Sequence, residues 1–233
     1  MVTTVVFDLD DTLYDELDYC RSGFKAVSEF LAGRIASLPA GRIYDRLWAE
    51  FSAGNHEATF NAALDALGQS YDDQLISRLV TIYRTHKPEI TLPPDSLNVL
   101  DLLSTRYTLA LLTDGYMPAQ QLKVQALGIA KYFKCVIYTE LLGRHCWKPS
   151  SAGFEEIIRR LNTRPRDMAY VADNPIKDFI APNALGILTI QVLRPGRLHK
   201  QTAPDPVAQP RLAIQKISDL PDLLQKLSDH RPV

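Results

Sequence analysis

The chain has 233 residues, of which 46% are hydrophobic and 23% are charged, and its formal net charge at pH 7 is -1. This composition is ordinary for a globular protein, and the near-neutral charge argues against a general nucleic-acid or membrane-surface binder. The three cysteines form no CxxC pair, so neither a disulfide framework nor a zinc ribbon is indicated. Asp8 interrupts the first apolar segment too early for a signal peptide, and no apolar run approaches the roughly 20 residues that span a bilayer. We therefore expect a cytoplasmic protein that binds neither nucleic acid nor membrane.

Short apolar segments recur along the chain and are typical of buried parallel strands. They occupy residues 2–7, 107–113, 135–138, 168–172 and 187–192. Amphipathic helical patterns lie between them at 94–104, 118–127 and 151–161. This alternation of strands and helices predicts an α/β fold, in which helices cover both faces of a parallel sheet.

Residues 14–88 show helical periodicity and no convincing strand. The expected helices are 17–31, 42–52, 57–67 and 72–85. A helical block of this length is too long for a simple crossover connection, so we predict an inserted domain. The predicted domains are a core of residues 1–14 and 93–233 and a helical insert of residues 15–92. Four prolines predict a loop over 194–211, and an apolar pattern over 212–227 predicts a closing helix.

Polar side chains follow the predicted strands where each strand ends. They are Asp8, Asp10 and Thr12 after the first strand, Thr113 and Asp114 after the second, Lys148 after the third, and Asp173, Lys177 and Asp178 after the fourth. The carboxyl ends of parallel strands share one edge of a sheet, and ligands bind there. We therefore expect these residues to converge on one pocket.

The residue types at this edge indicate phosphoryl chemistry. Three carboxylates, those of Asp8, Asp10 and Asp173, would repel one another, and a hard divalent cation such as Mg²⁺ would relieve the repulsion. Lys148 and the Thr113 hydroxyl would supply hydrogen-bond donors for an anion beside the metal. One carboxylate can attack phosphorus, and another can protonate the leaving oxygen and later activate water.

Four segments resemble the motifs of the haloacid dehalogenase-like (HAD) superfamily. Residues 8–12 match its DxDxT motif I, 111–115 resemble motif II, Lys148-Pro149 with Phe154 resemble motif III, and 171–178 resemble motif IV. The resemblance covers nearly the whole chain, including the position of the helical insert. In motif IV, Ala172 stands where glycine is usual, but Asp173 follows it as in the family pattern.

The resemblance implies a role for each motif residue in catalysis. Asp8 would be the nucleophile that becomes an aspartyl-phosphate, and Asp10 would be the general acid and base. Thr113 and Lys148 would hold the phosphoryl oxygens, and Lys148 would also damp the charge of Asp8. Asp114 would bind substrate mainly through its backbone amide.

The resemblance also implies the metal ligands. Asp8, the backbone carbonyl of Asp10 and the carboxylate of Asp173 would hold Mg²⁺. Asp178 would act indirectly, through water or through other site residues.

The fold implied by the resemblance is a Rossmann-like core with an all-helical, C1-type cap. The activity implied is that of a Mg²⁺-dependent phosphatase acting on a small phosphorylated metabolite, either a sugar phosphate or a nucleoside monophosphate, in a monomer or a homodimer. A phosphomutase and a non-catalytic binding protein on the same fold are the alternatives. Dehalogenases of the superfamily lack the second motif I aspartate, so Asp10 favours phosphate-ester chemistry over dehalogenation.

Overall fold

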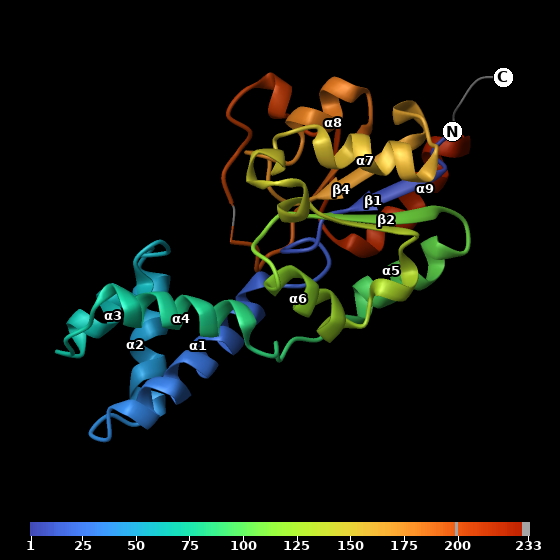
Figure 1. Ribbon diagram of the computed structural model, residues 1–233. Helices are drawn as coiled ribbons and strands as arrows, with labels where there is room; N and C mark the ends of the chain where they lie inside the picture. Colours follow the sequence, from blue (N-terminus) through green and yellow to red (C-terminus); the bar gives the residue numbers. More distant parts are fainter. Residues whose placement is uncertain (199, 230–233) are drawn as a thin grey trace. The chain divides into compact units, whose positions relative to one another are not determined.

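The computed structural model describes residues 1–198 and 200–229, which fall into two compact units (Figure 1). Met1–Leu17 and Thr91–Val233 make up the first unit, and Asp18–Ile90 make up the second. His199 of the predicted 194–211 loop and residues 230–233 of the predicted core lie outside the described residues.

The first unit is built on a sheet whose six strands, counted over the described residues, are all parallel. They are β1 Thr4–Phe7, β2 Thr108–Thr113, β3 Cys135–Tyr138, β4 Met168–Ala172, β5 Leu188–Val192 and β6 Leu212–Ile214. Their order across the sheet is β3-β2-β1-β4-β5-β6, which places β1 inside the sheet with a neighbour on each side. The predicted parallel α/β fold is confirmed.

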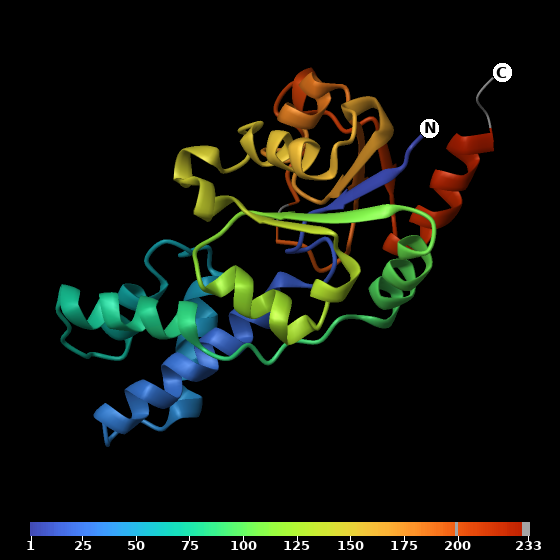
Figure 2. The same ribbon diagram turned by 45° about the vertical axis from the view of Figure 1, so that its right-hand side comes forward.

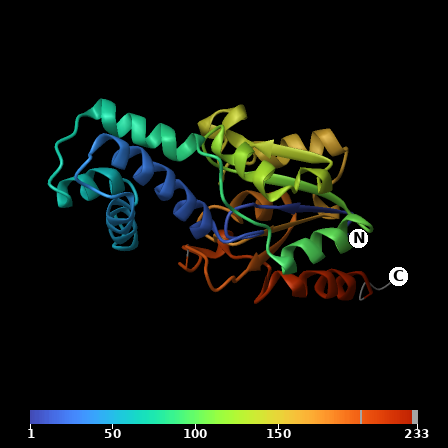
Figure 3. The same cartoon turned by 90° about the horizontal axis from the view of Figure 1, so that it is seen from below.

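Helices cover both faces of this sheet. They are α5 Pro94–Ser104, α6 Ala119–Leu127, α7 Ala152–Leu161, α8 Ile180–Leu185 and α9 Leu220–Asp229. Helices α7 and α8 lie on one face, and α5 and α6 lie on the other (Figures 1 and 2). The view from below shows α5 beside α9, and the two helices are in contact (Figure 3). Because both faces are covered, the strands are mostly apolar instead of alternating between apolar and polar residues.

The core beneath α7 shows how this burial is achieved. Phe154 and Ile157 of α7 are fully buried against Val6, Ala172 and their neighbours on the sheet. The ring of Phe154 meets that of Tyr170 edge-on, with centroids 4.8 Å apart. This contact buries the ring of Tyr170 in the core, while its hydroxyl group bonds to Lys148 at the polar edge of the sheet.

The C-terminal part of the first unit differs from prediction. The closing helix expected over 212–227 begins only at Leu220, because Leu212–Ile214 form β6 and pair with β5. The backbone N–H of Leu193 donates to the carbonyl of Ile214. A three-residue strand carries too little periodicity to be distinguished from a helical pattern. Helix α8 was not predicted, whereas the loop predicted after β5 contains only a short 3-10 turn among its described residues, Pro206–Ala208.

The second unit contains helices joined by loops and has no strand among its described residues. Its helices are α1 Glu16–Arg34, which begins in the first unit, α2 Ala40–Ser52, α3 Thr59–Ala66 and α4 Asp73–Thr85. The side chain of Asp72 caps α4 by accepting the N–H of Leu75 at 2.8 Å. Phe24, Leu47, Leu64 and Leu79 are buried in one shared cluster. No helix among the described residues is long and apolar enough to cross a membrane.

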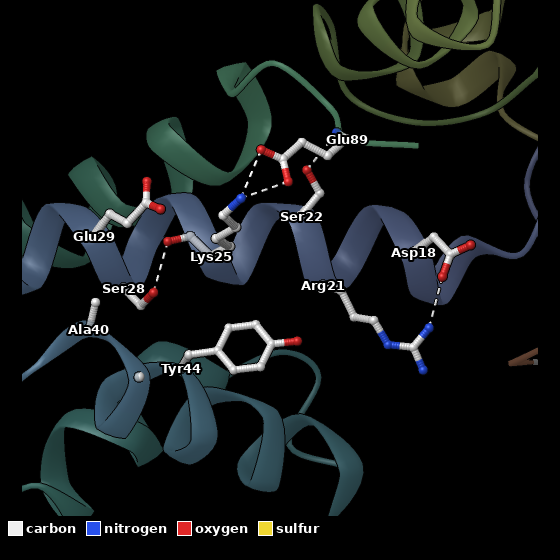
Figure 4. Close-up of a pocket in the computed structure, with 10 residues that line it drawn as sticks. Asp18, Arg21, Ser22, Lys25, Ser28, Glu29, Ala40, Tyr44 and Glu89 are labelled. Atoms are coloured by element: carbon white, nitrogen blue, oxygen red, sulfur yellow. Dashed lines mark hydrogen bonds and ion pairs between the residues drawn. The ribbon is translucent and has the colours of Figure 1, made fainter. Parts of the chain in front are cut away.

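A hollow of about 430 Å³ lies within the helical unit, between α1 and α2 (Figure 4). Lys25 of α1 pairs with the carboxylate of Glu89, with Nζ–O distances of 2.9 and 2.8 Å. Arg21 pairs with Asp18 at 2.8 Å on the same helix. Four of the charged groups that line this hollow, Lys25, Glu89, Arg21 and Asp18, therefore find partners inside the unit.

Truncating Phe154 tests the packing beneath α7. We expect Phe154→Ala to lower the free energy of unfolding by about 3–5 kcal/mol, because it opens a cavity against Tyr170. Urea denaturation followed by circular dichroism measures the change. Leu102→Ala, at an exposed position of α5, is the control and should change stability by no more than about 0.5 kcal/mol. Equal effects of the two substitutions would contradict the described core.

Candidate active site

The carboxyl ends of β1, β2 and β4 lie at the same level of the sheet. Phe7 is in register with Leu111 on one side and Val171 on the other. Asp8 follows Phe7 directly, and Asp173 lies two residues after Val171, so both start from neighbouring points of one edge. The N–H of Asp8 continues the ladder by donating to the carbonyl of Val171 at 2.9 Å.

A tight turn after β1 places the motif I residues. The N–H of Leu13 donates to the carbonyl of Leu9 at 2.9 Å, and Asp11 has a φ of 55°. Aspartate tolerates this left-handed conformation better than most residues. The carboxylate of Asp11 accepts the N–H groups of Glu16 at 2.9 Å and Leu198 at 2.6 Å. The turn is thus anchored both to the start of α1 and to the loop that follows β5.

Lys148 joins the carboxylates at the centre of the site. Its buried Nζ lies 2.5 Å from Asp8 Oδ1, 2.7 Å from Asp178 Oδ1 and 3.0 Å from the Tyr170 hydroxyl. Burial opposes the charged form of Lys148, but Asp178 and Asp8 outweigh it and raise the lysine pKa well above its usual value. Burial also raises the pKa of Asp8, to about 6, although the Lys148 charge acts in the opposite direction.

Three carboxylates at this edge form a group that fits a divalent cation. Asp8, Asp173 and Asp178 each offer one oxygen, and these oxygens lie within 4.8 Å of one another. Asp173 Oδ2 is buried and has no hydrogen-bond partner. Burial and the charges of Asp178 and Asp8 raise the pKa of Asp173 to about 9. A buried carboxylate oxygen without a donor, beside other oxygen ligands, is what a hard cation such as Mg²⁺ would satisfy.

The two oxygens of Asp178 are engaged differently from those of Asp173. Its Oδ1 lies near Lys148 and the Tyr170 hydroxyl, and its Oδ2 accepts the N–H of Asn174 at 3.0 Å. Burial disfavours its charge, but Lys148 and Lys177 outweigh this effect and hold the pKa of Asp178 below its ordinary value. Asp178 therefore contacts the residues around the nucleophile directly.

The Asp10 side chain is held by three donors from other positions. Lys123 Nζ lies 2.8 Å away, the Tyr14 hydroxyl 2.5 Å and Gln120 Nε2 2.9 Å. Burial alone would raise the pKa of Asp10, but the Lys123 charge and these hydrogen bonds lower it. Asp8 and Asp10 are two residues apart and each pairs with a buried lysine, but their pKa values are shifted in opposite directions.

The residues of motif II contact the same glutamine, Gln120. Gln120 Nε2 donates to the Thr113 hydroxyl at 2.5 Å as well as to Asp10. Gly115 has a φ of 141°, and a Cβ at this position would lie 2.8 Å from the Gln120 side chain. Glycine is needed here to give the backbone its conformation and the amide its space. The side chain of Asp114, predicted to act through its backbone, accepts the Thr139 hydroxyl at 2.8 Å and the Lys148 N–H at 3.1 Å.

Several residues that sequence reasoning did not single out belong to this site, among them Tyr14, Tyr170, Gln120 and Lys123. Tyr170 stands in an apolar strand and has the pattern of a core residue. Gln120 and Lys123 are three residues apart on α6, a spacing that places both side chains on one face of the helix. Their spacing after motif II could have indicated that Gln120 and Lys123 face the site. Nothing in the sequence distinguishes Tyr170 from the other strand residues.

Comparison with known proteins identifies the family of the chain. A family model for haloacid dehalogenase-like hydrolases matches residues 2–186. The chain belongs to this family. The resemblance found in the four motifs is thereby confirmed.

Several relatives of this hydrolase match nearly its whole length. It is 28% identical to a glyceraldehyde 3-phosphate phosphatase of Methanopyrus kandleri, over 98% of this chain and 99% of that protein. It is 26% identical to a protein of the same name from Methanocaldococcus jannaschii, over 97% and 99% of the two chains. The crystal structure of a 2-haloacid dehalogenase from Pseudomonas syringae pv. Tomato DC3000 is similar, with a TM-score of 0.66, 25% identity and coverage of 97% and 100%.

Replacing Asp173 tests the cation site of this HAD-like hydrolase. We expect Asp173→Asn to weaken Mg²⁺ binding about tenfold or more, as measured by isothermal titration calorimetry. Without metal, the variant should be at least as stable as the wild type, because a buried and unpaired carboxylate is removed. Asp222→Asn, at an exposed position of α9, is the control. Unchanged Mg²⁺ affinity in Asp173→Asn would contradict the assignment.

Proposed function

We propose that this hydrolase is a Mg²⁺-dependent phosphatase that hydrolyses a small phosphorylated metabolite through an aspartyl-phosphate on Asp8. The observation that carries the proposal is that the two oxygens of the Asp8 carboxylate have different contacts. Oδ1 is held by Lys148 at 2.5 Å, whereas the contact recorded for Oδ2 among the described residues is the Thr12 hydroxyl at 3.5 Å. One oxygen is fixed and the other is available for attack. The two glyceraldehyde 3-phosphate phosphatase relatives support a sugar phosphate as the substrate.

The first chemical step forms the covalent intermediate. Asp8 Oδ2 attacks phosphorus, the bond between phosphorus and the ester oxygen breaks, and Asp10 in its protonated form gives its proton to the departing ester oxygen, which leaves as the alcohol. In the second step a water molecule attacks phosphorus and loses a proton to Asp10. The acyl-phosphate bond breaks, so that phosphate leaves and the Asp8 carboxylate is restored. The sum is ester plus water giving alcohol plus phosphate.

The remaining site residues position these groups. Asp8, Asp173 and the backbone carbonyl of Asp10 would hold Mg²⁺, which supplies positive charge next to the phosphoryl group when it is bound. Thr113 and the backbone amide of Asp114 would bind phosphoryl oxygens. Lys148 would hold Asp8 in its attacking orientation and reduce its repulsion of the substrate.

We further propose that the helical insert, residues 15–92, acts as the C1-type cap that selects the leaving group. Location in the cytoplasm and the choice between monomer and homodimer stay predictions. The choice between hydrolysis and phosphoryl transfer to a second hydroxyl of the substrate is decided by the product, because a mutase releases no inorganic phosphate.

Phosphate release is the direct test of the proposed function. With Mg²⁺, the wild type should release phosphate from para-nitrophenyl phosphate and from glyceraldehyde 3-phosphate, and it should release no chloride from 2-chloropropionate. Asp8→Asn should lower kcat about a thousandfold or more, because the nucleophile is lost, and should leave the circular dichroism spectrum unchanged. Asp222→Asn is again the control. Release of chloride, or wild-type turnover by Asp8→Asn, would overturn the proposal.

Replacing Asp10 separates the two chemical steps. Asp10→Asn should lower steady-state turnover about a hundredfold or more, because proton transfer is lost. It should still take up a phosphoryl group from a substrate with a good leaving group, such as acetyl phosphate. Intact-protein mass spectrometry after rapid quenching should show an added phosphoryl group on Asp10→Asn and none on the double variant with Asp8→Asn. A phosphorylated double variant would place the covalent intermediate elsewhere.

A further inference from the structure

Lys177 is a charged residue at the candidate site to which the mechanism above gives no part. It lies between β4 and α8 and lines a hollow of about 130 Å³ at the carboxyl edge of the sheet. Its side chain is 36% exposed. The other described residues that line this hollow are all acidic: Asp8, Asp10, Asp11, Glu16, Asp114 and Asp173.

Lys148, the cation expected to bind the phosphoryl group, already contacts acceptors of the protein itself. An ammonium group has three N–H donors. Lys148 Nζ has three acceptors within 3.0 Å, namely Asp8 Oδ1, Asp178 Oδ1 and the Tyr170 hydroxyl. Its side chain is only 1% exposed. Donating to a phosphoryl oxygen would cost Lys148 one of these three partners.

Lys177 is placed differently. Its Nζ lies 3.7 Å from Asp114 Oδ2, which is too long for a hydrogen bond. Asp114 already accepts hydrogen bonds from the Thr139 hydroxyl and the Lys148 N–H. The ion pair with Lys177 is therefore a loose contact that keeps the ammonium group beside the hollow while leaving its donors available.

We propose that Lys177 supplies a further donor to the non-bridging oxygens of the phosphoryl group that is transferred to Asp8, in addition to Lys148, which also positions Asp8. This proposal rests on the proposed phosphatase function. A phosphate monoester entering the hollow brings a dianion among carboxylates, and an ammonium group at the rim offsets this repulsion by donating charge-assisted hydrogen bonds. Lys177 is then a substrate-binding residue, whatever alcohol the substrate carries.

The test uses inorganic phosphate, which carries the recognised group and no leaving group. Lys177→Met should raise the inhibition constant of phosphate against para-nitrophenyl phosphate about tenfold or more, because charge-assisted hydrogen bonds are lost. Isothermal titration calorimetry in Mg²⁺ should show the same loss of phosphate affinity. Lys177→Arg should restore most of it. Lys134→Met, at an exposed position after α6, should leave both values unchanged.

The outcomes separate this proposal from its alternatives. If Lys177 only pairs with Asp114, Lys177→Met lowers the melting temperature and leaves phosphate affinity unchanged, which overturns the proposal. Should Lys177→Met fail to fold, Lys177→Arg and Lys177→Gln provide the comparison, and equal affinity in the two overturns it as well. If the wild type hydrolyses no phosphate ester, the proposed function fails. The calorimetric comparison still decides the role of Lys177, because absence of phosphate binding by the wild type would refute it.

Discussion

The ammonium group of Lys148 lies buried between the carboxylates of Asp8 and Asp178, and the rest of the site depends on this compensation of charge. Carboxylates withdrawn from water repel one another strongly, and each loses hydration. The lysine offsets both effects and also bonds to Tyr170, while its backbone N–H bonds to Asp114. Lys148, in the segment after β3, thus contacts the segments that follow β1, β2 and β4.

The topology of the sheet explains why these segments meet. The chain runs from β1 outward to β2 and β3, and then returns to place β4 on the other side of β1. The direction of winding therefore reverses between β1 and β4, and in parallel α/β sheets ligands bind outside the strand ends at such a point. Asp8 and Asp173 follow these two strands. The buried Asp173 oxygen without a donor lies at the same place, which is where a cation would complete the arrangement.

Two aspartates separated by one residue are given different environments. Asp8 shares its lysine with Asp178, and burial raises its pKa, whereas the pKa of Asp10 is lowered by Lys123 and by three hydrogen bonds. Paired carboxyl groups whose pKa values are pushed apart are candidates for acid and base roles. Here Asp8 has the higher pKa and Asp10 the lower one, and a cation bound beside Asp8 would lower the pKa of that nucleophile.

The strands of the core and the place of the polar residues could be predicted from sequence, because buried parallel strands are short apolar runs and functional side chains follow them. Strand β6 could not be predicted, because three residues form a strand only where the edge of β5 is open to pair with them. The partners of Asp10 and the contact between Tyr170 and Lys148 could not be predicted from the sequence either. Those contacts depend on how α6 and the connection after β3 are rotated and packed against the sheet, and this packing is settled by residues distant in the chain.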